Sequence, residues 1–167
     1  MKRCRAARPD VFKIEHLQHS LYVSPPSPAG NLGEIAVPSI LIADDNPAIR
    51  SLLRSYVESQ TGFKACGEAY DGVDAIEKAK QLQPDVVLID LSMPRLNGLE
   101  AASILKRTMP ATKVILFSFH VEHLGRSLAK IVGVDFVLSK DEPLSKLADH
   151  LRTLLPGKAE MNASAHH

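Results

Sequence analysis

Short apolar runs alternate with amphipathic segments five times along the chain, and this alternation restricts the fold more than any other feature. The apolar runs are Ser39–Ala43, Phe63–Ala69, Val86–Ile89, Lys113–Ser118 and Val134–Ser139. Runs of this length that are rich in β-branched residues are typical of buried strands. Five strands, each followed by a helix, predict a parallel sheet joined by right-handed crossovers. We therefore expect an α/β fold.

Apolar residues recur at helical spacing after the predicted strands. The expected helices run from Pro47, from Asp71, over Gly98–Arg107, over His120–Ile131 and from Pro143. Asn46 is a suitable N-cap for the first of them, with Pro47 at the first helical position. The side chains expected to face the core are Ile49, Leu52, Leu53, Tyr56 and Val57 in the first helix, Ala75, Ile76, Ala79 and Leu82 in the second, and Leu144, Leu147, Leu151 and Leu154 in the last.

Two doubly wound strand orders are common for such chains. The six-stranded dinucleotide-binding order needs a longer chain and a glycine-rich first turn. Here the first turn reads Asp44-Asp45-Asn46-Pro47, and no GxGxxG or GxxxxGK[ST] pattern occurs. The predicted fold is therefore a flavodoxin-like doubly wound (βα)5 parallel sheet with strand order 2-1-3-4-5.

Composition divides the chain into a flexible extension (1–37), a folded domain (38–156) and a disordered tail (157–167), because proline, glycine and polar residues gather outside the alternating part. The net charge of +1 argues against a nucleic-acid surface over the whole protein. No apolar run approaches the about 20 residues of a membrane span, and no secretory signal is evident. Cys4 and Cys66 do not suggest a disulfide framework. We expect a cytoplasmic protein without direct nucleic-acid or membrane contacts.

Asp90 directly follows the third predicted strand, where open α/β sheets place their ligands. Taken alone, it is more simply a loop cap. The predicted strand order brings Asp44 and Asp45 beside Asp90, and Ser118 and Lys140 to the same edge. Three carboxylates in one crevice repel one another unless a cation intervenes. All-oxygen ligands favour a hard divalent ion such as Mg²⁺.

Such a site can accept a phosphoryl group, because the metal ion and the ammonium group neutralise the incoming oxygens. Asp90 is the expected nucleophile, since carboxylates form acyl phosphates. The hydroxyl of Ser118 can donate to a phosphoryl oxygen, and Lys140 supplies a positive charge.

In order and approximate spacing, these residues resemble the receiver domain of two-component response regulators. The matching elements are Asp44-Asp45, Asp90 with Met93-Pro94 and Asn97-Gly98, Ser118 and Lys140. The resemblance covers about Ser39 to Leu155. It implies that Asp45 and Asp90 bind Mg²⁺ directly, joined by the backbone carbonyl of Ser92, while Asp44 acts mainly through water.

The resemblance also implies a phosphoryl donor and an output. Asp90 takes the phosphoryl group from a phosphohistidine on a sensor histidine kinase or phosphotransfer protein, and Ser118 and Lys140 then hold the phosphoryl oxygens. The displaced loops alter the surface of the predicted fourth helix, fifth strand and fifth helix, which could also form a homodimer. The local amino-acid sequence most resembles that of receivers that usually precede a helix-turn-helix domain. Only about a dozen residues follow Leu155, so we expect signalling through protein contacts without a DNA-binding output domain, and no enzymatic activity beyond phosphorylation and dephosphorylation at Asp90.

Two positions depart from the family pattern. The usual switch aromatic falls on Val137, while Phe136 sits one residue earlier and, by strand alternation, on the opposite face. Phe119 stands where the family usually has a small residue, so we expect slow phosphorylation by small donors. These departures favour one alternative, a degenerate receiver that acts as a phosphorylation-independent adaptor. An aspartyl phosphatase of the haloacid-dehalogenase type is disfavoured, because its second acid would fall on Ser92.

Overall fold

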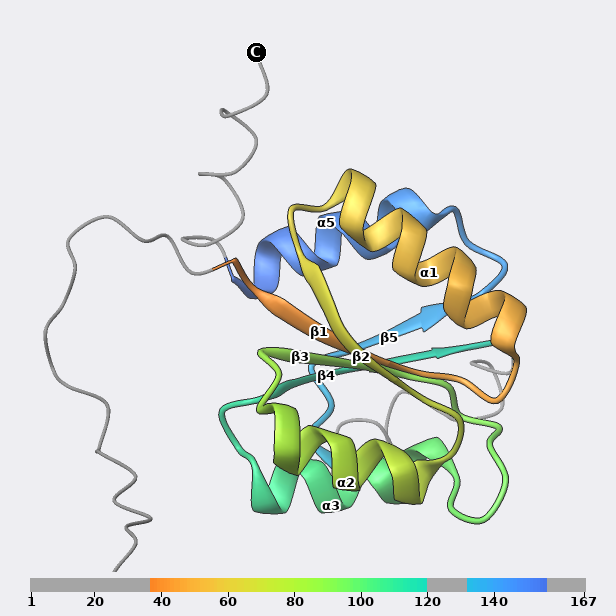
Figure 1. Ribbon diagram of the computed structural model, residues 1–167, viewed down its shortest axis with the longest axis vertical. Coiled ribbons are helices and arrows are strands. Elements are labelled where there is room, and N and C mark those ends of the chain that lie inside the picture. Colours follow the sequence, from red (N-terminus) through yellow and green to blue (C-terminus); the bar gives the residue numbers. More distant parts are fainter. Residues whose placement is uncertain (1–36, 120–131, 156–167) are drawn as a thin grey trace, which may run out of the picture. The chain divides into compact units, whose positions relative to one another are not determined.

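In the residues that the computed structural model describes, 37–119 and 132–155, five parallel strands form one sheet in the order β2-β1-β3-β4-β5 (Figure 1). The strands are β1 (Ser39–Ala43), β2 (Lys64–Ala69), β3 (Val86–Ile89), β4 (Lys113–Ser118) and β5 (Phe136–Ser139). The helices are α1 (Pro47–Gln60), α2 (Gly72–Leu82), α3 (Gly98–Thr108) and α5 (Leu144–Leu154). The predicted flavodoxin-like order is confirmed. The helix expected at 120–131 lies outside the described residues, as do the predictions for 1–36 and 157–167.

Capping groups start three helices close to where the sequence predicts them. The side chain of Asn46 accepts a hydrogen bond at the start of α1, and Asp71 does the same for α2. Helix α3 begins with a capping box, in which Asn97 and Glu100 each accept from the other's backbone N–H. Each of these caps follows a loop at the carboxyl end of a strand, so the caps also fix the loops that surround that edge.

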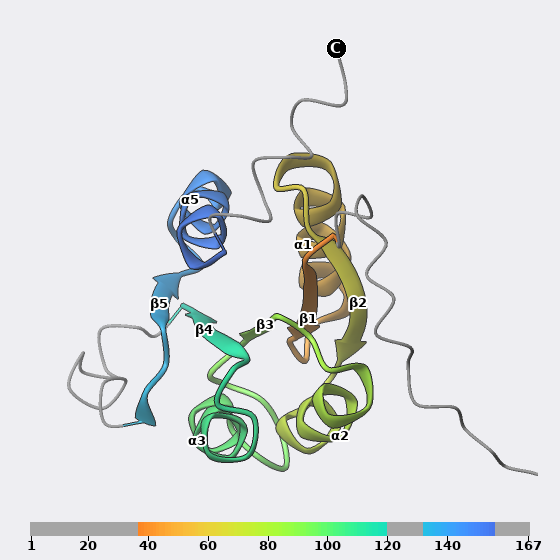
Figure 2. The ribbon, with the colours of Figure 1, turned by 90° about the vertical axis from the view of Figure 1, so that its left-hand side faces the viewer.

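Helices α1 and α5 cover one face of the sheet, and α2 and α3 cover the other (Figure 2). Strand side chains alternate between the two cores. The strand residues of the first core include Ile40, Ile42, Val86, Leu88 and Ile115, and those of the second include Leu41, Ala43, Val87, Ile89 and Val114. All four residues of β3 are buried. Burial on both faces explains why the central strand reads as a continuous apolar run.

Two leucines predicted for the core are exposed instead, Leu52 by 57% and Leu82 by 42%. The prediction for Leu52 was wrong because neighbouring helical residues point about 100° apart. Leu53 and Val57 already face the sheet, so Leu52 is turned toward solvent. Leu82 lies in the last turn of α2, next to Gly67 on the edge strand β2, where the sheet ends.

The loop after β3 folds back closely on the strand that it leaves. A Cβ atom at Gly98 would collide with the carbonyl oxygen of Asp90, and the Gly98 N–H donates to the Leu91 carbonyl at 2.9 Å. Only glycine leaves space for this approach. The tight loop returns the chain to the start of α3 and holds Asp90 at the edge of the sheet.

None of the helices in the described ranges has the length and apolar character that crossing a membrane requires.

The contrast between Leu52 and Leu53 tests the assignment of the core. Leu53→Ala should lower the free energy of unfolding by about 2–5 kcal/mol, because a fully buried leucine is lost and a cavity remains. Leu52→Ala, one residue away on the same helix, should change it by less than about 0.5 kcal/mol. Urea unfolding followed by circular dichroism measures both. Equal destabilisation by the two substitutions would contradict the observed orientation of α1.

Candidate functional site

Polar residues from four strand ends meet at the carboxyl edge of the sheet. Asp44 and Asp45 follow β1, Asp90 follows β3, Ser118 ends β4 and Lys140 follows β5. Strands β1 and β3 are neighbours, and their pairing continues into a hydrogen bond from the Asp90 N–H to the Ala43 carbonyl at 2.8 Å. The strand order thus brings together residues that lie up to 96 positions apart in sequence.

Asp44, Asp45 and Asp90 form a compact acidic cluster. One carboxylate oxygen from each lies within 4.8 Å of those of the other two. Asp44 and Asp90 are buried, with 1% and 5% of their surface exposed, whereas Asp45 is exposed. The cluster is therefore open to solvent on the Asp45 side.

Lys140 inserts its ammonium group between the two buried carboxylates. Its Nζ lies 2.6 Å from Asp44 Oδ2 and 3.1 Å from Asp90 Oδ1, and its side chain is only 6% exposed. The Lys140 N–H donates to the Ser118 carbonyl at 3.1 Å, which fixes the backbone from which this side chain extends. One ammonium against three carboxylates leaves the cluster with an excess of negative charge.

Each buried carboxylate also accepts a backbone hydrogen bond from its own loop. Asp44 Oδ1 accepts from the Asn46 N–H at 2.9 Å, and Asp90 Oδ2 accepts from the Ser92 N–H at 3.2 Å. A buried carboxylate needs such donors to offset its lost hydration. Both side chains are therefore held in one orientation before any ligand binds.

The acidic cluster meets the chemical requirements of a hard divalent cation. All of its donors are oxygens, which Mg²⁺ prefers, and its charge is not balanced by Lys140 alone. The exposed carboxylate of Asp45 leaves room for the waters that a bound Mg²⁺ retains. The residues present therefore fit such an ion.

Ser118 and Phe119 lie beside this cluster at the end of β4. Ser118 is 3% exposed, while Phe119 is 53% exposed, with its ring centroid 5.4 Å from Lys140 Nζ. Such a contact between a cation and an aromatic face is favourable. Phe119 thus touches the lysine of the site while it is also open to solvent.

Phe136 and Val137 face opposite sides of the sheet, as strand alternation predicted. Phe136 packs on the core under α1 and α5, and its ring centroid lies 4.1 Å from that of His150 on α5. Val137 packs against the core under α2 and α3. The position of the family's usual switch aromatic is thus occupied by Val137, and Phe136, on the opposite face of the sheet, does not take its place.

Arg50 on α1, which the sequence analysis did not single out, contacts the turn that carries the acidic pair. Its Nη1 donates to the Asp44 carbonyl at 2.7 Å and to the Asp45 carbonyl at 3.3 Å. The one available sequence signal is its position one helical turn after the N-cap Asn46, which directs a long side chain back toward the start of the helix.

Comparison with known proteins places this geometry in a family. The model of the response regulator receiver domain matches residues 40–152. The uncharacterized transcriptional regulatory protein YxjL of Bacillus subtilis strain 168 is 39% identical over 121 residues, which are 72% of this chain and 55% of YxjL. The response regulator protein VraR of Staphylococcus epidermidis strain RP62A is 33% identical over 120 residues, which are 72% of this chain and 57% of VraR.

A solved structure agrees with these matches. The crystal structure of the response regulator domain of Thermotoga maritima CheB superposes with a TM-score of 0.62 and 30% identity, and the match covers 74% of this chain and 96% of that one. The chain spans little more than half the length of the curated relatives YxjL and VraR. It contains the receiver motifs, the receiver strand order and the acidic cluster at the carboxyl edge of the sheet, and it belongs to the response regulator receiver domain family.

Proposed function

We propose that Asp90 accepts a phosphoryl group, in the presence of Mg²⁺, from a phosphohistidine on a sensor histidine kinase or phosphotransfer protein. The observation that carries this proposal is the buried ammonium group of Lys140 between Asp44 and Asp90. A structural ion pair needs one acid and one base, whereas here two buried acids share one lysine and a third acid stands at the entrance. A divalent cation would balance these charges, and the cation and the ammonium group could then neutralise the oxygens of an incoming phosphoryl group.

The transfer forms a bond between one carboxylate oxygen of Asp90 and phosphorus. It breaks the bond between phosphorus and nitrogen in the donor, and the electron pair returns to the imidazole ring. Lys140 can shift from the Asp90 carboxylate to an oxygen of the attached phosphoryl group, because it already lies 3.1 Å from Asp90 Oδ1. The Ser118 hydroxyl is proposed to donate a hydrogen bond to another oxygen of that phosphoryl group.

Asp45, Asp90 and the carbonyl of Ser92 are the proposed direct ligands of Mg²⁺, with Asp44 acting through water. The Ser92 N–H donates to Asp90 Oδ2, so the loop that offers the carbonyl is tied to the nucleophile. When bound, the ion would neutralise charge on the phosphoryl oxygens. Hydrolysis of the acyl phosphate at Asp90 returns the domain to its starting state, and no other reaction is proposed for it.

The proposed output is a change in protein contacts at the surface of β5 and α5. Strand β5 ends directly before Lys140, and α5 begins four residues after it. The same surface is a candidate for a homodimer. We propose no direct DNA contact for this domain.

A phosphorylation-independent adaptor is the competing function, favoured by Phe119 and Val137. The ion pairs of Lys140 with Asp44 and Asp90 weigh against it, because an adaptor gains nothing from burying two acids around one lysine.

Asp90→Asn should abolish phosphorylation, because the amide lacks the nucleophilic carboxylate. Incubation with acetyl phosphate and Mg²⁺ followed by intact-protein mass spectrometry measures the fraction of protein that carries a phosphoryl group. Asp149→Asn, which removes an exposed carboxylate on α5, should be labelled like the native chain. Equal labelling of native protein and Asp90→Asn would refute the acceptor assignment. Labelling of neither by acetyl phosphate or a phosphorylated kinase would favour the adaptor.

Asp45→Asn should weaken Mg²⁺ binding by at least about tenfold, since it removes a direct ligand and one negative charge. Isothermal titration calorimetry with Mg²⁺ alone measures the dissociation constant. Asp141→Asn, which neutralises an exposed acid after Lys140, is the matched control and should change it little. An unchanged constant in Asp45→Asn would remove Asp45 from the proposed ligand set.

Phe119→Ala should raise the initial rate of phosphorylation by acetyl phosphate several-fold, because the aromatic ring beside Lys140 is proposed to narrow the entrance. The rate can be followed on gels that separate the phosphorylated form. Phe119→Leu, which keeps most of the bulk, should stay close to the native rate. A native rate that Phe119→Ala does not exceed would show that the ring does not limit access.

A further inference from the structure

Arg50 makes three hydrogen bonds that join the acidic turn to the edge of the sheet. Its Nη1 donates to the carbonyl oxygens of Asp44 and Asp45, and its Nε donates to Glu68 Oε2 on β2 at 3.2 Å. The side chain of Arg50 is 17% exposed. A long cation that is this well buried has lost much of its side-chain freedom, so its contacts hold one geometry.

The two carbonyl groups bonded to Arg50 belong to the two peptide units that flank the Cα atom of Asp45. One is the unit between Asp44 and Asp45, and the other is the unit between Asp45 and Asn46. The orientations of these units set the backbone dihedrals of Asp45, because peptide units are planar. Arg50 therefore restrains the direction in which the Asp45 side chain leaves the backbone.

Asp45 depends on this restraint more than the other two acids do. Asp44 and Asp90 are buried and are each held by Lys140 and by a backbone N–H. The Asp45 carboxylate is exposed, and within 37–119 and 132–155 no hydrogen bond or ion pair to it is observed. What directs it toward the other acids is thus its own backbone.

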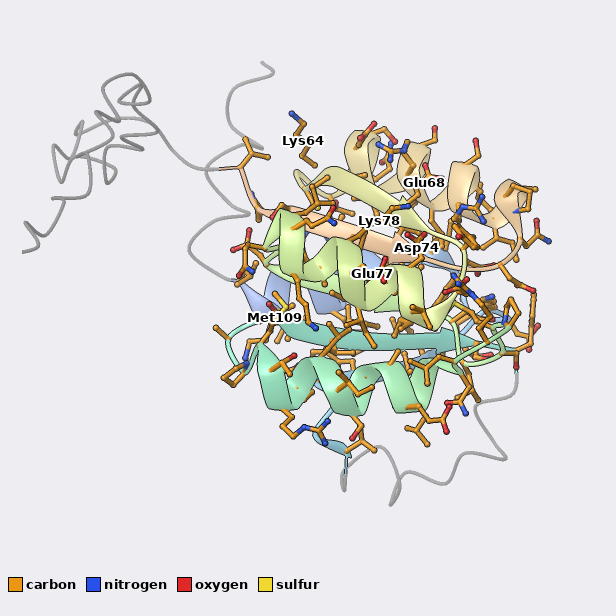
Figure 3. All side chains as sticks on the ribbon, turned by 60° about the horizontal axis from the view of Figure 1, so that its bottom comes forward. Lys64, Glu68, Asp74, Glu77, Lys78 and Met109 are labelled. Atoms are coloured by element: carbon orange, nitrogen blue, oxygen red, sulfur yellow. The ribbon has the colours of Figure 1, made fainter. Side chains whose placement is uncertain are left out.

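Glu68 anchors the guanidinium group of Arg50 from the opposite side. It lies on β2 beside α1 (Figure 3) and also accepts from Arg54 Nε at 2.6 Å. The hydrogen bond from Arg54, and to a smaller extent the one from Arg50, lowers the pKa of the Glu68 carboxyl below its ordinary value, although partial burial opposes this shift. Glu68 is therefore ionised at neutral pH.

Arg54 supplies a natural control. It shares Glu68 with Arg50 and lies one turn further along α1, but its other acceptors are the Ala65 carbonyl and Glu58. It carries the same charge, and among the described residues its hydrogen bonds and ion pairs do not include the turn at Asp44 and Asp45.

We infer that Arg50 is a positioning residue of the Mg²⁺ site. It orients Asp45 by donating to the carbonyl groups of both flanking peptide units while Glu68 anchors its guanidinium group. The inference rests on the proposed function, since it assumes that Mg²⁺ binds at Asp45. Arg50 also acts as a nearby positive charge, and the two effects have opposite signs. Loss of the charge alone would strengthen binding of a cation, whereas loss of the orientation weakens it.

Arg50→Met separates these effects, because it keeps an apolar stem and removes both the charge and the donors. We expect its dissociation constant for Mg²⁺, measured by calorimetry on the full chain with Mg²⁺ alone, to rise about tenfold or more, as for other residues that orient metal ligands. Arg50→Lys, which retains a charge and a donor, should recover part of the affinity. Arg54→Met should bind Mg²⁺ like the native chain or slightly more tightly.

Urea unfolding in EDTA, compared with unfolding in saturating Mg²⁺, provides a second readout. A residue with a purely structural role lowers stability equally in both conditions, whereas Arg50→Met should lower the stabilisation that Mg²⁺ adds. If Arg50→Met does not fold, Glu68→Gln loosens the same anchor and should weaken Mg²⁺ binding more than Arg54→Met does.

The outcomes distinguish the inference from the function on which it rests. Unchanged or tighter Mg²⁺ binding by Arg50→Met, or by Glu68→Gln where the former does not fold, overturns the positioning role and leaves the proposed function standing. A native chain that does not bind Mg²⁺ overturns both.

Discussion

Repulsion among three carboxylates is the physical constraint around which the functional edge of this domain is built. A parallel sheet gathers the carboxyl ends of all its strands at one edge, so acids that follow different strands are forced together. The buried pair, Asp44 and Asp90, is tolerated because Lys140 lies between them and because each accepts a backbone N–H. The exposed Asp45 leaves the cluster with uncompensated negative charge, and that imbalance is what a divalent cation can relieve.

The loops that bear these charges are held mainly through their backbones. Gly98 allows the loop after β3 to close against the Asp90 carbonyl. Arg50 holds the carbonyl groups of the turn after β1, and the Lys140 N–H extends the pairing of β5 with β4. A site preorganised in this way loses little entropy when it binds a ligand.

The two departures from the usual receiver pattern, Phe119 and Val137, lie after β4 and in β5, outside the acidic cluster. The aromatic residue nearest to the usual switch position, Phe136, packs against His150 and so links β5 to α5. Phe119 instead touches Lys140 from the solvent side. In the described part of the chain, the rings of Phe119 and Phe136 therefore contact Lys140 and His150 respectively, while position 137 carries the aliphatic side chain of valine.

The sequence alone determined the strand bounds of β1, β3 and β4, the cap at Asn46, and the strand order, because these depend on local apolar periodicity and on a few topological rules. It also implied which acids reach one edge. Only the tertiary structure decided that Lys140 pairs with both Asp44 and Asp90, that Leu52 faces solvent, and that Arg50 holds the peptide units around Asp45. Those contacts join residues on different elements, and their distances depend on how helices and loops pack against the sheet, which no pattern along the chain records.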